Sequence, residues 1–102
     1  MLNKMEIHAG LELCRATPNA LLVDVRNDFE YAEGHIPGSF NLAMSRILKE
    51  ADAELPDKTQ PLFLYCQSGA RSARAAKLLS IMGYEHVTDL GGIAGYGGER
   101  EV

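Results

Sequence analysis

The feature that most constrains the fold is a short apolar run that leads into a cysteine, a glycine-containing loop and a helix. Residues 62–65 follow a proline and are all apolar, which is typical of a strand buried on both faces of a parallel sheet. Residues 72–82 carry apolar side chains at helical spacing. Cys66 lies between the two, where unpaired backbone N–H groups and the helix dipole favour an anion and a thiolate. This pattern predicts a cysteine enzyme with an anionic substrate.

The rest of the chain alternates strands and helices, which implies a parallel sheet covered on both faces. Further strands are expected at residues 20–26, 39–43 and 86–90, with a weaker edge strand at 5–8, and helices at 11–16, 27–33 and 45–55. Ligands of such sheets bind beyond the carboxyl ends of the strands, where Cys66 and Arg26 both fall. We expect one domain over residues 1–102, with a loose, glycine-rich tail from about residue 93.

Charge and cysteine content narrow the function classes. The net charge of −4 argues against a nucleic-acid partner, and no stretch approaches membrane-spanning length. The two cysteines, Cys14 and Cys66, lack the paired spacing of a metal motif, and neither a metal nor another cofactor is expected. Two thiols in a chain of this size fit a reducing compartment, so we expect a cytoplasmic protein. Cys14 lies among leucines and is interpreted as a core residue in preference to a resolving thiol.

Three motifs, taken together, resemble one known family. Residues 22–26 (Leu-Val-Asp-Val-Arg), Glu30, residues 34–39 (Gly-His-Ile-Pro-Gly-Ser) and Asn41 resemble the amino-terminal signature of the rhodanese-like sulfurtransferase domain. Residues 66–72 (Cys-Gln-Ser-Gly-Ala-Arg-Ser) resemble its active-site loop, and residues 89–93 (Asp-Leu-Gly-Gly-Ile) its closing motif. The resemblance covers nearly the whole chain and implies a three-layer α/β fold, a five-stranded parallel sheet with helices on both faces. Tyr96 stands where the family usually has a tryptophan, which leaves open how the pocket mouth is covered.

The resemblance also implies an activity. Cys66 would take a sulfane sulfur from a small anionic donor such as thiosulfate, carry it as a persulfide, and pass it to cyanide, a small thiol or a protein thiol. A second hypothesis uses the same loop in a carrier module that delivers the sulfur to a partner protein. Catalytically silent scaffolding is disfavoured because the loop cysteine is present.

The length of the loop separates two chemistries. Four residues, Gln67, Ser68, Gly69 and Ala70, lie between Cys66 and the arginine. Cysteine-dependent phosphatases need five, which make a cradle wide enough for a tetrahedral phosphate. The shorter loop suits a single sulfur atom and disfavours phosphatase or arsenate-reductase activity.

The loop residues are expected to bind the substrate, chiefly through their N–H groups. Gly69 is expected because of the backbone conformation of the loop, with close approach of the ligand to the backbone as the alternative. Arg71 is expected to bind the donor, with pairing to a carboxylate as the alternative. Ser72 is expected to cap the helix, with a hydrogen bond to the sulfur as the alternative.

Four charged or titratable residues elsewhere are predicted to support the loop. Asp24 and Arg26 are interpreted as members of a buried network of ion pairs or backbone hydrogen bonds. Glu30 is interpreted as a structural residue in the first turn of the helix at 27–33. His35 is a possible base, but the attacking group is already a thiolate, so a role in shaping the turn at 34–38 is preferred.

Overall fold

A computed structural model describes residues 2–102 and contains one sheet of five parallel strands in the order β1-β5-β4-β2-β3. The strands are β1 Leu2–Lys4, β2 Leu21–Asp24, β3 Phe40–Asn41, β4 Leu62–Cys66 and β5 Val87–Gly92. The helices are α1 Ile7–Ala16, α2 Asp28–Glu33, α3 Ile47–Glu54 and α4 Ala70–Ile81, with short 3-10 turns at Met44–Arg46 and Ile93–Gly95. The predicted five-stranded parallel sheet is confirmed.

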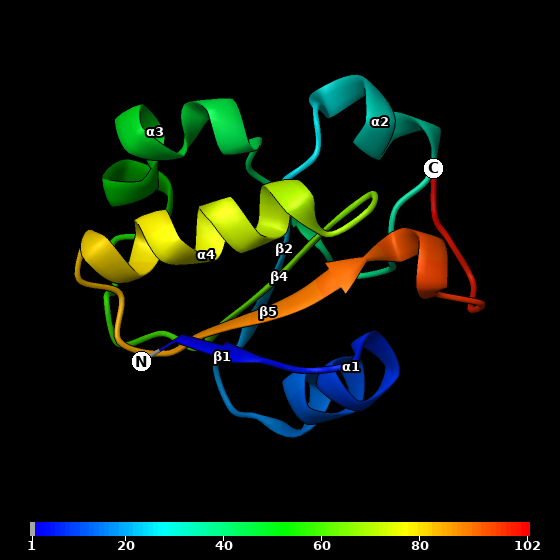
Figure 1. Ribbon diagram of the computed structural model, residues 1–102, viewed down its shortest axis with the longest axis horizontal. Coiled ribbons are helices and arrows are strands. Elements are labelled where there is room, and N and C mark those ends of the chain that lie inside the picture. The colour runs from blue at the N-terminus through cyan, green and yellow to red at the C-terminus, as the bar shows by residue number, and fades with distance from the viewer. Residues whose placement is uncertain (1) are drawn as a thin grey trace.

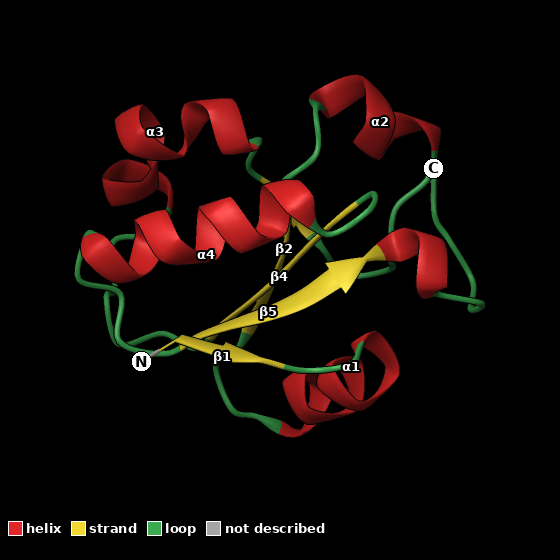
Figure 2. Cartoon of the chain, in the orientation of Figure 1, coloured by secondary structure: helices red, strands yellow, loops and turns green. Residues whose placement is uncertain are grey.

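Helices cover both faces of the sheet, as expected. Figure 1 shows α3 and α4 on one side and α1 on the other, and Figure 2 shows the resulting helix–sheet–helix layers. All five residues of β4 are buried. Leu62, Leu64 and Cys66 belong to the apolar cluster under α3 and α4, whereas Phe63 and Tyr65 belong to the cluster under α1. The unbroken apolar run of β4 therefore reflects burial on both faces.

The amino-terminal elements differ from the prediction. The edge strand is Leu2–Lys4 and not 5–8, and the first helix begins at Ile7 and not at residue 11. The reason is a cap: the Glu6 carboxylate accepts the N–H groups of His8 and Ala9. These two bonds hold the pKa of Glu6 down at about 2. Cys14 packs in the apolar cluster under α1, and burial raises the pKa of its thiol.

The carboxyl-terminal segment makes defined contacts. Ile93 is fully buried, and the Arg100 guanidinium donates to its carbonyl. Glu101 exchanges two backbone hydrogen bonds of 2.8 Å with His35, which joins the end of the chain to the turn after α2. These contacts do not measure how much the segment moves, so the loose tail expected from about residue 93 stays a prediction.

None of the helices in the described part of the chain is long and apolar enough to cross a membrane. The cytoplasmic location stays a prediction.

Candidate active site

The candidate site is centred on Cys66, the last residue of the central strand β4. Gly69 caps α4 in the left-handed region, with φ of +103°, and this turn brings its backbone N–H to within 3.0 Å of the cysteine Sγ. The Ser72 hydroxyl lies 3.5 Å from the same sulfur. The sulfur therefore lies at the amino-terminal end of α4, where a peptide N–H and the helix dipole both favour negative charge.

The cysteine side chain lies beneath the loop. Cys66 has 0% of its surface exposed, whereas Gln67, Ser68 and Ala70 are exposed. Several backbone N–H groups were expected around Cys66, and among residues 2–102 one of them, that of Gly69, donates a hydrogen bond to its Sγ. A molecule in solution can contact this sulfur only when the loop or its neighbours move.

Helix α4 begins two residues earlier than predicted, which corrects the expectation for Ser72. Because Gly69 occupies the capping position, Ser72 lies inside the first turn and does not cap the helix. Its hydroxyl instead donates toward the carbonyls of Gly69 and Gly91 and lies beside the sulfur. Ser72 thereby links the loop to the end of β5.

A pair of glycines at the end of β5 packs directly against the loop. A Cβ atom placed on Gly92 would lie 2.5 Å from the Gln67 carbonyl oxygen and 2.9 Å from the backbone of Ser68. The Ala94 N–H also donates to the Gln67 carbonyl, at 3.2 Å. Sequence reasoning did not give these glycines a role in the site, although the closing motif contained the signal. The backbone contact requires a residue without a side chain at position 92.

The Arg71 guanidinium is paired with a carboxylate. It donates to both oxygens of Glu30, at 2.6 and 2.9 Å, and so ties the first turn of α4 to α2. The hydrogen bonds from Arg71 lower the pKa of Glu30 from 4.5 to about 2. Arg71 therefore makes the carboxylate contact that was expected as the alternative. Binding of the donor by Arg71 stays a prediction.

Asp24 and Arg26 form a buried ion pair at the end of β2. The Arg26 Nη2 atom lies 2.8 Å from the Asp24 carboxylate and 2.7 Å from the Gly34 carbonyl. The Arg26 Nη1 atom lies 3.4 Å from the Gln67 side-chain oxygen. The predicted ion-pair network is present, and it reaches the cysteine loop through Gln67.

His35 lies in the turn after α2 with its ring occupied. The ring stacks on Tyr31 with centroids 3.7 Å apart, Nδ1 contacts the Tyr31 carbonyl at 2.8 Å, and Nε2 lies 3.5 Å from the Glu101 carboxylate. These contacts support the preferred role in shaping the turn. Tyr65 of β4 also holds this turn, because its hydroxyl accepts the Ile36 N–H at 3.1 Å.

Fold and site together define a parallel α/β protein with one cysteine at the end of its central strand, set on a helix N-terminus. The model of the rhodanese-like domain family matches residues 8–99. The chain belongs to that family, which confirms the resemblance of its three motifs.

Named relatives agree with this assignment. The chain is 34% identical over 71 residues to the thiosulfate sulfurtransferase PspE of Escherichia coli, covering 70% of this chain and 68% of the relative. It is 35% identical over 92 residues to a sulfurtransferase of Allochromatium vinosum, covering 90% and 84%. Its fold matches the solution structure of a rhodanese-like domain from Anabaena with a TM-score of 0.85 and 28% identity, covering 99% and 80%. These similarities support sulfur transfer as the general activity.

Proposed function

We propose that this chain moves a sulfane sulfur from a small anionic donor such as thiosulfate to cyanide or a thiol, through a persulfide on Cys66. The observation that carries the proposal is the Gly69 N–H aimed at the cysteine Sγ at the amino-terminal end of α4. The similarity to a protein named as a thiosulfate sulfurtransferase supports thiosulfate as the donor.

The first step is a displacement at sulfur. The Cys66 thiolate attacks the outer sulfur of thiosulfate, and a new sulfur–sulfur bond forms as the one in thiosulfate breaks. Sulfite leaves with the electron pair of the broken bond, so no external oxidant or reductant is required. The Gly69 N–H and the end of the α4 dipole stabilise the negative charge at the reacting sulfur.

The second step returns the cysteine to its starting form. The acceptor attacks the outer sulfur of the Cys66 persulfide, and the electron pair of that bond returns to the cysteine as a thiolate. Cyanide gives thiocyanate, and a thiolate gives a new persulfide. Because sulfite leaves before the acceptor reacts, the steady-state kinetics should be ping-pong.

The burial of Cys66 adds a conformational requirement. Since the side chain has no exposed surface, the loop of residues 67–70 has to open before the donor sulfur can approach. Gln67 and Ser68 are exposed and make up the outer part of this loop, so they are the residues that the donor meets first.

The test is thiocyanate formation from thiosulfate and cyanide, with the two cysteines exchanged one at a time. Cys66→Ala should abolish the reaction, whereas Cys14→Ala, which alters a thiol in the α1 cluster, should leave it at the wild-type level. Activity that survives in Cys66→Ala contradicts the proposal. Rapid sulfur loading with slow release to cyanide, but fast release to a protein thiol, would favour the carrier hypothesis.

A further inference from the structure

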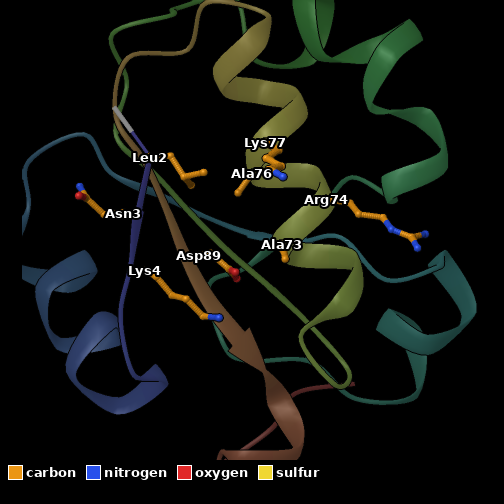
Figure 3. Close-up of a pocket in the computed structure, with 8 residues that line it drawn as sticks. All are labelled: Leu2, Asn3, Lys4, Ala73, Arg74, Ala76, Lys77 and Asp89. Carbon is orange, nitrogen blue, oxygen red and sulfur yellow. The ribbon is translucent and has the colours of Figure 1, made fainter.

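A hollow of about 340 Å³ lies at the edge of the sheet, beside α4 and apart from Cys66. Figure 3 shows its lining, which comes from β1, α4 and β5. The residues are Leu2, Asn3, Lys4, Ala73, Arg74, Ala76, Lys77 and Asp89. The volume lies in the range of pockets that bind small molecules. The hollow exists because β1 is the edge strand and α4 does not extend over it.

A buried carboxylate forms part of the floor. Asp89 is only 4% exposed, and one of its oxygens accepts the Gly91 N–H at 2.9 Å. The other oxygen receives no hydrogen bond from residues 2–102. Since no buried side-chain oxygen in that range lacks a partner, this oxygen keeps some exposed surface. Because Asp89 lines the hollow, this second oxygen is the acceptor that its carboxylate can offer to a ligand there. A buried carboxylate with a free acceptor position favours a ligand that carries a charged N–H donor.

Two lysines at the hollow have no acidic partner among residues 2–102. Lys4 is paired in register with Asp89 on the neighbouring strand, but no ion pair joins them. Lys77 projects from α4 on the other side and likewise forms no ion pair in the described chain, whereas Lys58 elsewhere pairs with Asp52 at 2.8 Å. Two unpaired ammonium groups beside one pocket, in a chain with net charge −4, favour an anionic group on the ligand.

The rest of the wall is apolar and small. Leu2 from β1 and Ala73 from α4 are the exposed apolar residues of the lining, and Ala76 lies buried behind them. The Arg74 guanidinium points away from the other labelled side chains in Figure 3. The pocket therefore combines an acceptor, a donor pair and an aliphatic surface.

We propose that this pocket binds a small zwitterion of the aliphatic amino-acid type. Its ammonium group contacts Asp89, its carboxylate contacts Lys4 and Lys77, and its side chain packs on Leu2 and Ala73. The proposal is independent of the sulfur-transfer chemistry, because none of these residues contacts Cys66 or its loop through a side-chain hydrogen bond.

The experiment follows the amide NMR signals of the ¹⁵N-labelled protein during titration with L-leucine and with two compounds that have the same aliphatic side chain. 4-Methylpentanoate lacks the ammonium group, and 3-methylbutylamine lacks the carboxylate. Leucine should shift the amide signals of Lys4, Ala73 and Asp89 in a saturable way. Each half-ligand should bind about tenfold more weakly or worse, since each loses one charged contact.

Variants locate the contacts. Asp89→Asn keeps an oxygen for the Gly91 N–H but removes the charge, and Lys77→Gln removes one cation; each should weaken leucine binding about tenfold. Lys49→Gln, an exposed lysine of α3 with no ion pair in the described chain, is the matched control and should bind like the wild type. Thermal melting checks that Asp89→Asn is folded. If Asp89→Asn does not fold, the affinity of Lys77→Gln for leucine decides the question.

Three results would overturn the proposal. The first is the absence of saturable shifts at these amides up to the solubility limit of leucine. The second is equally tight binding of either half-ligand, which would show that one charge alone is recognised. The third is wild-type affinity for leucine in Lys77→Gln.

Discussion

Replacing Gly92 with alanine tests the contact between β5 and the cysteine loop. The backbone of Gly92 is extended, with φ of −101° and ψ of 137°, so alanine adopts it without strain. The added methyl group would lie 2.5 Å from the Gln67 carbonyl oxygen, about 1 Å closer than an ordinary van der Waals contact. Because the obstacle is backbone and not a flexible side chain, the loop itself has to move.

The size of the effect follows from two opposing contributions. Overpacking costs about 1–3 kcal/mol, and the smaller entropy of the unfolded chain with alanine returns about 0.4–1 kcal/mol. We expect Gly92→Ala to lower the free energy of unfolding by about 1–2 kcal/mol, measured by urea denaturation, and the melting temperature by about 5–15 °C. The rate of sulfur loading from thiosulfate should fall as well, since the displaced loop carries the Gly69 N–H away from the sulfur.

Gly95→Ala is the matched control. A Cβ atom on Gly95 meets nothing within 4 Å, so this variant should be as stable and as active as the wild type. If Gly92→Ala matches Gly95→Ala in both stability and sulfur loading, the close packing of β5 on the loop is refuted.

Three further predictions follow from the neighbouring contacts. The folded protein holds the pKa of Glu30 below its ordinary value, so the wild type should lose the stability that the Glu30–Arg71 pair contributes as the pH falls from 4.5 to about 2. Glu30→Gln should be about 1 kcal/mol less stable at neutral pH, and its free energy of unfolding should change less over that pH range. Tyr65→Phe leaves the buried Ile36 N–H unpaired and should cost about 1–3 kcal/mol in urea denaturation, with no loss meaning that water replaces the hydroxyl. Cys66 should react with iodoacetamide much more slowly in the native protein than in urea, whereas equal rates would show that the loop is open.

The central strand and its loop could be predicted from the sequence because their signals are local. A fully buried parallel strand requires a continuous apolar run, and β4 has one. The cysteine at its end, followed by Gly69 and a helical pattern, was enough to predict that Cys66 lies at the amino-terminal end of a helix. The start of α4 was placed two residues late, because Gly69 supplies a backbone cap that has no side-chain signature.

Contacts between distant segments could not be predicted. Arg71 and Glu30 are separated by 41 positions, and both a carboxylate and an anionic donor are compatible with an arginine at that place in the loop. The role of Gly92 likewise depends on the approach of β5 to the loop, which is a property of the folded sheet. The edge strand β1 is three exposed residues long, too short to show a period of its own.

The most direct test of the account is the intact mass of the protein after incubation with thiosulfate and removal of the excess. The account predicts a gain of one sulfur atom per chain, located on the peptide that contains Cys66 and removed by cyanide as thiocyanate. An unchanged mass, or a gain that persists in Cys66→Ala, would contradict it.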